Sequence, residues 1–162
     1  MASPAPAPHF LLQPGTSVDL DEVMRVMSEA FSDEFGEAWT RSQLSGILPM
    51  AGVSLTVARS SGDVGRAAGF SLARTVADEA ELLLIAVDPI FRRRGVARHL
   101  LDHFIAGAKA EKVRRVHLEI REGNPAVAMY RDLGFEPIGR RRDYYLGGDQ
   151  RRHDAITLAR SP

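Results

Sequence analysis

The most constraining feature of the sequence is an uninterrupted apolar run that is followed at once by a basic loop and a second apolar pattern. The run reads LLLIAV over residues 82–87 and stops at Asp88-Pro89. Such a run is typical of a central strand that is covered on both faces, and a proline cannot continue the ladder. From Gly95 to Lys112 apolar residues recur at helical spacing, which predicts an amphipathic helix. The sequence therefore predicts a covered strand, a tight loop and a helix in succession.

The other patterns predict further strands and helices around this unit. Ser17 or Asp19 is expected to cap a first helix, and Thr40 or Ser42 a second. The expected strands are 10–13, 54–58, 67–75, 113–121, 136–145 and 153–159, and the expected helices are 20–31, 39–50 and 125–133. The order β-α-α-β-β-β-α-β-α-β-β describes one mixed α/β (α+β) sheet with helices on its faces.

The length of 162 residues is that of one compact domain. Residues 1–8, rich in proline and alanine, lack the features of a secretory signal, so we expect a flexible tail followed by a single domain over 9–162.

Charge and composition exclude several classes of function. Lys plus Arg and Asp plus Glu each number 21, so the overall field predicts neither a nucleic-acid partner nor a membrane partner. The chain has no cysteine, which excludes disulfides, thiolate metal sites and a cysteine nucleophile, and fits a cytoplasmic protein. The arginines nevertheless cluster in the second half of the chain, which indicates a local anionic ligand. The oligomeric state stays open.

The basic loop RRRGVA, residues 92–97, predicts an anion site. A strand that turns into a helix presents unpaired N–H groups and the positive end of the helix dipole. Gly95 allows a phosphate to approach the backbone, and the arginines add charge-assisted hydrogen bonds. The alternative is a solvated basic loop. The loop matches neither the G-x-G-x-x-G dinucleotide pattern nor a Walker loop.

Three further sets of residues leave two readings open. Glu119 lies within an alternating strand and either points to solvent or serves a site. Tyr130, beside Leu133 and Phe135, is either a core tyrosine with a satisfied hydroxyl or a functional one. His99 and His103 stand one helical turn apart, but with no third ligand at suitable spacing they indicate a solvated helix face, and no metal is expected.

Two longer stretches carry a resemblance to a known family. Residues 79–104 read EAELLLIAVDPIFRRRGVARHLLDHF, and residues 116–135 read VHLEIREGNPAVAMYRDLGF. They resemble the GNAT superfamily of acyl-CoA-dependent N-acetyltransferases, whose phosphate-binding signature R/Q-x-x-G-x-G/A matches RRRGVA. The motifs IGRRRDYY and DAITLA extend the match, which is closest to the RimI-type ribosomal-protein alanine N-acetyltransferases. The first half of the chain is only loosely similar.

The resemblance implies a fold and a set of site residues. The fold is a mixed, mostly antiparallel sheet of about seven strands with about four helices. Glu119 matches the family's general base and Tyr130 its general acid, while Tyr144 and Tyr145 match an aromatic pair that shapes the peptide groove. Residues that match the acetyl-CoA site are Ile85, Ala86, Val87, Arg92, Arg93, Arg94, Gly95, Val96, Ala97, Arg98 and Asn124. Because the segment between Glu119 and Tyr130 is one residue shorter than the family pattern, Gly123 is an alternative to Asn124.

The resemblance also implies an activity: acetyl transfer from acetyl-CoA to a primary amine within a ternary complex. The implied acceptor is a protein N-terminus, with a ribosomal protein as a candidate partner. A small-molecule amine, a lysine side chain and a non-catalytic acyl-CoA-binding role remain alternatives.

Overall fold

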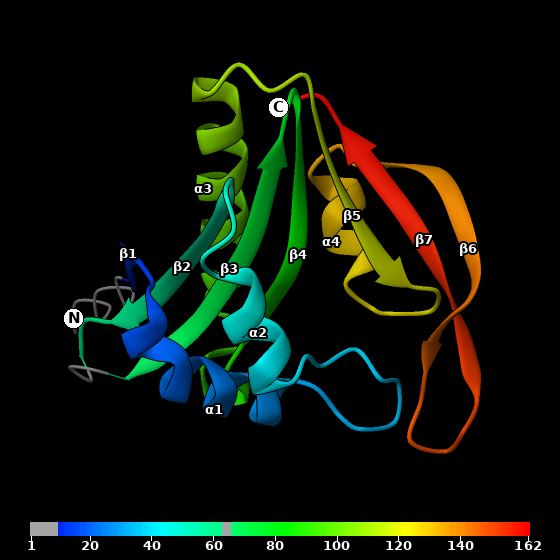
Figure 1. The fold of residues 1–162 in the computed structure, drawn as a ribbon, viewed down its shortest axis with the longest axis horizontal. Helices are drawn as coiled ribbons and strands as arrows, with labels where there is room; N and C mark the ends of the chain where they lie inside the picture. Colours follow the sequence, from blue (N-terminus) through cyan, green and yellow to red (C-terminus); the bar gives the residue numbers. More distant parts are fainter. Residues whose placement is uncertain (1–9, 63–65) are drawn as a thin grey trace, which may run out of the picture.

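The computed structural model describes residues 10–62 and 66–162, so the tail expected over residues 1–8 lies outside the described residues. Seven strands form one sheet, shown in Figure 1. The strands are β1 (Phe10–Pro14), β2 (Val53–Ser60), β3 (Ala67–Val76), β4 (Glu79–Val87), β5 (Arg115–Arg121), β6 (Glu136–Leu146) and β7 (Arg152–Arg160). The helices are α1 (Leu20–Ala30), α2 (Arg41–Ile47), α3 (Val96–Ala110) and α4 (Val127–Asp132), with 3-10 turns η1 (Ser17–Asp19) and η2 (Pro89–Phe91). This element order confirms the predicted one.

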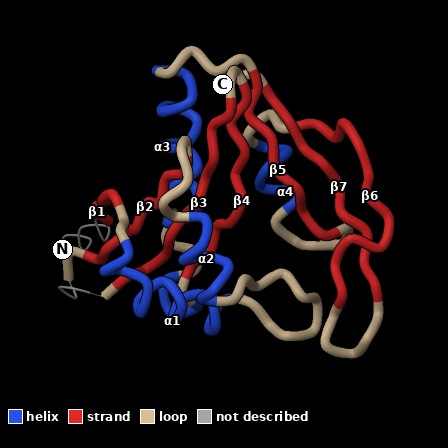
Figure 2. The backbone as a smooth tube through the Cα atoms, in the orientation of Figure 1, coloured by secondary structure: helices blue, strands red, loops and turns tan. Residues whose placement is uncertain are grey.

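The sheet is mixed and mostly antiparallel, as predicted. Its strand order is β1-β2-β3-β4-β5-β7-β6, and β4–β5 is the parallel pair among antiparallel ones. The helix α3 crosses over between those two parallel strands (Figures 1 and 2). The predicted central strand β4 thus lies between β3 and β5, with helices on both faces of the sheet.

Two apolar layers hold the helices on opposite faces of the sheet. Val23, Val26 and Met27 of α1 pack with Phe70 and Leu72 of β3. On the other face, α3 and α4 pack against β4 and β5 through a cluster that includes Leu101, Phe104, Val116, Leu118, Tyr130 and Phe135. Fully burying an aliphatic side chain contributes about 1.5–3 kcal/mol, so these stripes fix which face each helix covers.

The predicted helix ends require two corrections. Asp19 is the N-cap residue of α1, as one of the two predictions had it, but its side chain makes no cap hydrogen bond there. Thr16 caps the preceding turn η1: its hydroxyl accepts from Val18 N–H, and Asp19 accepts from Thr16 N–H at 2.8 Å. The predicted helix 39–50 is shorter, covering Arg41–Ile47, because Thr40 begins it with a capping box to Gln43. A capping box satisfies two terminal donors reciprocally, so it sets the boundary after the apolar residue Trp39.

The strands β4 and β5 pair along only part of their length. Their register begins at Glu79–Arg115 and ends at Leu82–Leu118. Beyond that point the strands separate, as Figure 1 shows. The register of β4 with β3 shifts at the same place, passing from Leu72–Leu84 to Ala73–Leu82. Leu83 is therefore a bulge, and a bulge bends its strand and ends regular pairing.

Candidate active site

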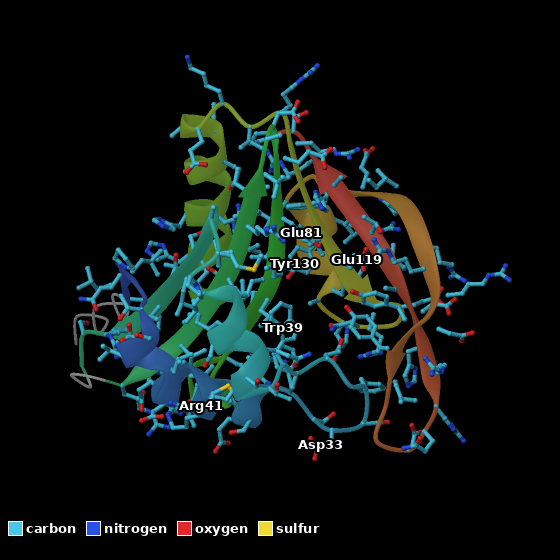
Figure 3. The ribbon with its side chains drawn as sticks, in the orientation of Figure 1. Asp33, Trp39, Arg41, Glu81, Glu119 and Tyr130 are labelled. Atoms are coloured by element: carbon cyan, nitrogen blue, oxygen red, sulfur yellow. The ribbon has the colours of Figure 1, made fainter. Side chains whose placement is uncertain are left out.

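A cavity of about 300 Å³ lies where β4 and β5 separate. We call it the central cavity. Many residues singled out in the sequence line it: Ile85, Ala86, Val87, Arg92, Glu119, Asn124, Tyr130, Tyr144 and Tyr145. Glu81, Glu119 and Tyr130 lie around the gap between β4 and β5 in Figure 3. The fold therefore brings together residues from β4, β5, α4 and β6.

The backbone of β4 presents an open edge to the central cavity. The N–H of Asp88 donates to Ala68 on β3 at 2.8 Å. Because backbone groups alternate in direction along an antiparallel strand, Ala86 also faces β3, whereas the N–H and C=O of Ile85 and Val87 point the other way. The parallel pairing with β5 has already ended there. An extended ligand can add to this edge as a strand does.

The basic loop joins the central cavity to the start of α3. Arg93 has a φ of 61° and Gly95 a φ of 80°, so the backbone turns sharply before the helix. The backbone N–H of His99 donates to the carbonyl of Gly95 at 2.9 Å, which is the first hydrogen bond of α3. The N–H groups of Val96, Ala97 and Arg98 come before this bond and lie outside the helical hydrogen-bond ladder. Free amides at the start of a long helix favour an anion.

The arginine side chains of the loop already contact the protein. Arg92 donates to the carbonyl of Ala30 at 3.2 Å, Arg94 lies over the Phe91 ring, and Arg98 pairs with Asp102 at 3.2 Å. Of the loop residues, Arg92 lines the central cavity. The other predicted residues of this segment do not line the cavity. They lie on the adjoining loop and the first helical turn, and they are Arg93, Arg94, Gly95, Val96, Ala97 and Arg98. Apart from Arg92, the loop thus extends the cavity rather than forming its wall.

Glu119 faces the central cavity and not bulk solvent. Its side chain is 12% exposed, and Oε1 lies 2.8 Å from Nε of Arg141. Its second oxygen, Oε2, is buried without a hydrogen bond to any residue of the described ranges. Burial raises the pKa of Glu119 and the charge of Glu81 adds to the rise, while Arg141, His117 and a hydrogen bond with the Tyr144 side chain oppose it. A carboxylate with a raised pKa is a stronger base.

Tyr130 is both a core residue and a wall of the central cavity. Only 4% of the residue is exposed, and its ring packs edge-on against Phe135 at 5.8 Å. Burial raises the pKa of Tyr130, so the phenol keeps its proton. The two readings of this residue are therefore compatible, because the ring fills the core while the residue also lines the cavity.

The two tyrosines of β6 lie beside Glu119. Their rings are 4.9 Å apart and nearly perpendicular, and the Tyr145 hydroxyl reaches the Glu119 carbonyl at 3.5 Å. Burial raises the pKa of both Tyr144 and Tyr145. Tyr144 is 49% exposed, so it stands at the mouth of the cavity and Tyr145 stands deeper.

Asn124 lines the central cavity, but its side chain has structural partners. Its Oδ1 accepts from Ala126 N–H at 2.9 Å, and its Nδ2 donates to Glu37 at 3.2 Å. Glu37 also lies 3.4 Å from Arg121. Gly123, the alternative position, has a φ of 85° and is not among the residues that line the cavity. Asn124 therefore ties the β5–α4 turn to the segment between α1 and α2.

The cavity wall also contains residues that were not proposed from the sequence, among them Glu37, Trp39 and Glu81. The sequence could have indicated Glu81 as a site residue, because it is a charged residue within a largely apolar strand. It could also have indicated Trp39, because this is the single tryptophan of the chain. Glu37 lies in an irregular segment, where no periodicity predicts which way a side chain points.

Two other sequence features lie apart from the site. His99 and His103 are exposed on α3, which places them on its solvated face.

In the described ranges, no helix is long and apolar enough to cross a membrane.

Comparisons with known proteins show the family of the chain. The model of the acetyltransferase (GNAT) family matches residues 20–135. The chain is 43% identical over 96 residues to the ribosomal protein bS18-alanine N-acetyltransferase of Escherichia coli (strain K12), across 59% of this chain and 64% of that protein. It is 42% identical over 105 residues to the N-alpha-acetyltransferase RimI of Mycobacterium tuberculosis, across 64% of this chain and 63% of that protein.

The similarity in structure is more extensive than the similarity in sequence. The crystal structure of the ribosomal-protein-S18-alanine N-acetyltransferase from Escherichia coli has a TM-score of 0.83 and 29% identity, and the match covers 94% of both chains. The sequence matches, by contrast, span slightly less than two thirds of the curated relatives.

Proposed function

The chain belongs to the acetyltransferase (GNAT) family, and from that premise we propose that it transfers an acetyl group from acetyl-CoA to the N-terminal amine of a protein. One observation carries the proposal: an open strand edge, an amide-rich loop and a buried carboxylate adjoin one cavity. The setting we propose is the cytoplasm.

The residues around the central cavity fit acetyl-CoA. The free backbone groups of Ile85 and Val87 would pair with the amides of its pantetheine arm. The N–H groups from Arg93 to Arg98 would bind its pyrophosphate, and a Cβ added at Gly95 would meet no atom within 4 Å, so the backbone there is open to a ligand. Acetyl-CoA supplies the reactive thioester, and no metal enters the proposal.

Glu119 and Tyr130 divide the proton transfers between them. Glu119, buried and with a raised pKa, accepts the proton of the attacking amine directly or through water. As the new C–N bond forms and the C–S bond breaks, Tyr130 donates its phenolic proton to the departing sulfur. Transfer is direct because the chain has no cysteine to carry the acetyl group, and holding both reactants together replaces a bimolecular encounter.

The acceptor is proposed from the relatives and from the cavity wall. The relatives are named for acetylation of the alanine N-terminus of a ribosomal protein or of an N-alpha amine. Glu37, Glu81 and Glu119 place three carboxylates on the wall, which favours a cationic amine. Tyr144 at the mouth and Tyr145 behind it provide aromatic surfaces for the peptide that follows the amine.

A CoA-release assay tests the activity and the acceptor together. Because the chain has no cysteine, a thiol reagent reports free CoA without a protein background. We expect fastest release with a peptide that begins with alanine, and none when its N-terminus is formylated. Faster release with an N-blocked lysine peptide or a polyamine would replace the acceptor but keep the acetyl transfer.

The non-catalytic alternative is separated by binding. Calorimetry that detects acetyl-CoA binding without CoA release by any amine would make the protein an acyl-CoA-binding domain. Mass spectrometry of protein N-termini from cells with and without the protein would then identify the natural acceptor of an active enzyme.

A further inference from the structure

We propose that Arg141 is the positioning residue of the base: it holds Oε1 of Glu119 and leaves Oε2 as the atom that takes the proton from the acceptor amine. This inference rests on the proposed function, since it assigns distinct roles to the two oxygens of the same carboxylate.

The contacts of the two oxygens differ. Oε1 lies 2.8 Å from Nε of Arg141, the distance of a charge-assisted contact. Oε2 is buried, and no donor of the described ranges meets hydrogen-bond geometry with it; the Tyr144 side chain interacts with the same carboxylate and lowers its pKa, but less than Arg141 does. A buried carboxylate oxygen without a partner is costly, and Glu119 lines the cavity that would receive the amine. The free oxygen is therefore the one suited to bind a substrate hydrogen.

The sheet explains how Arg141 reaches Glu119 from a different strand. Glu119 pairs with Thr157 on β7, and Thr157 pairs with Gly139 on β6. Cross-strand partners share a face of the sheet, so Glu119, Thr157 and Gly139 form one row on that face, and Gly139 places no side chain there. Arg141 lies two residues further along β6, and alternation returns its side chain to the same face.

A bulge in β6 gives the Arg141 guanidinium a second contact. The register shifts between Arg141 and Tyr145, and Asp143 within the bulge has a φ of 53° and donates its N–H to Asp154 at 2.9 Å. Without the shift, Arg141 and Tyr144 would point to opposite faces. Instead the Arg141 guanidinium lies over the Tyr144 ring, 5.5 Å from its centre. It is held between an aromatic ring and the carboxylate.

The other titrating groups around Glu119 make this cation necessary. Glu81 of β4 adds a like charge, His117 lies on β5 itself, Tyr144 and Tyr145 come from β6, and Tyr130 of α4 shares the cavity. Thr157 on β7 does not titrate. Burial and Glu81 raise the pKa of Glu119, and Arg141 is the main opposing charge. Arg141 thus opposes protonation of the buried base.

The test compares Arg141→Gln with Arg142→Gln. Arg142 is the next residue, is exposed, and forms no ion pair with the residues described, so its loss removes the same charge without the contact. Two quantities are measured across pH: kcat/KM with the alanine peptide, and the carboxyl ¹³C signal of Glu119, assigned with Glu119→Gln.

We expect the acid limb of kcat/KM and the midpoint of the ¹³C titration to move together to higher pH in Arg141→Gln. Both should stay in place in Arg142→Gln. Arg141→Lys should restore the midpoint, because it keeps the charge, but only part of the rate, because an ammonium lacks the planar geometry of guanidinium. A loss of rate in Arg141→Gln with both midpoints unmoved would overturn the inference.

The two measurements distinguish a failure of this inference from a failure of the proposed function. If the wild-type protein releases no CoA with any amine, the proposed function fails. The ¹³C titration, which needs no turnover, would still decide whether Arg141 controls the ionisation of Glu119.

Discussion

The carboxylate of Glu119 on β5 and the phenol of Tyr130 on α4 line the same cavity, and burial raises the pKa of both. The same physical cause prepares them for opposite tasks. A raised pKa makes the Glu119 carboxylate a better proton acceptor, and it keeps the Tyr130 phenol protonated and able to donate.

Replacement of Glu119 by glutamine should lower kcat by about 100-fold, the usual effect of losing a general base. The deficit should widen as the pH falls below the ordinary amine pKa of about 8, because the variant depends on amine that is already deprotonated. Initial rates across pH with the alanine peptide measure this effect. A deficit that stays constant across pH would contradict the role of base.

Replacement of Tyr130 by phenylalanine should lower kcat by about 10- to 100-fold with little change in stability. The hydroxyl forms no hydrogen bond with any described residue, and phenylalanine preserves the packing on Phe135. Thermal unfolding and steady-state kinetics measure the two effects. A large loss of stability with unchanged kcat would indicate that Tyr130 is only a core residue.

Replacement of Gly95 by alanine should raise the KM for acetyl-CoA. At a φ of 80°, a side chain costs about 1–2 kcal/mol, and the loop must shift its amides to relieve that cost. The matched control is Gly107→Ala within α3, where an added Cβ also meets no atom within 4 Å. That change should stabilise the protein by up to about 1 kcal/mol and leave the KM unchanged.

Replacement of Asp88 by asparagine should lower the free energy of unfolding by about 2 kcal/mol, the scale of hydrogen bonds to a charged group. Asp88 is 2% exposed and accepts from Arg25 at 2.7 Å and from Arg66 at 3.1 Å. It also caps η2 through Ile90 N–H, directly before the basic loop, so acetyl-CoA binding should weaken as well. Asp21→Asn, which alters an exposed ion pair with Arg41, should change stability by less than about 1 kcal/mol.

The stability contributed by Asp88 should also depend on pH. Burial alone would raise the pKa of Asp88, but the hydrogen bonds from Arg25, Ile90 and Arg66 outweigh it and hold the pKa below the ordinary value of 3.8. A depressed carboxyl pKa contributes stability that is present above the unfolded value and is lost on acidification. Urea titrations should therefore show the difference between wild type and Asp88→Asn shrinking as the pH falls below about 4.

The parts of the fold that the sequence predicted depend on local backbone physics. A strand, a turn and a helix are defined here by side-chain period and backbone preference. The strand follows from the apolar run 82–87, the turn from Pro89 and Gly95, and the helix from the apolar stripe after them. The same holds for Thr40, one of the two residues expected to cap the second helix. The cap at Thr16 was missed because several neighbouring polar residues can cap, and only the backbone path selects one of them.

The parts of the site that remained unpredicted depend on contacts between distant segments. The contact between Arg141 and Glu119 needs two register relations and a bulge in β6, and Glu37 meets Asn124 through a segment without periodicity. The alternation of β5 placed Glu119 on the face opposite Val116, Leu118 and Ile120. It could not say whether that face met water or a cavity.

The sequence by itself therefore determined the order of the elements, the family and the loop before α3, because those depend on neighbours along the chain. Only the tertiary structure decided that β4 and β5 separate after Leu82, and that Glu119 and Tyr130 line the resulting cavity. The physical reason is that the burial of a side chain is not determined by that residue and its sequence neighbours alone. It arises when strands and helices from both halves of the chain exclude water from one place, and it is burial that raises the pKa of Glu119.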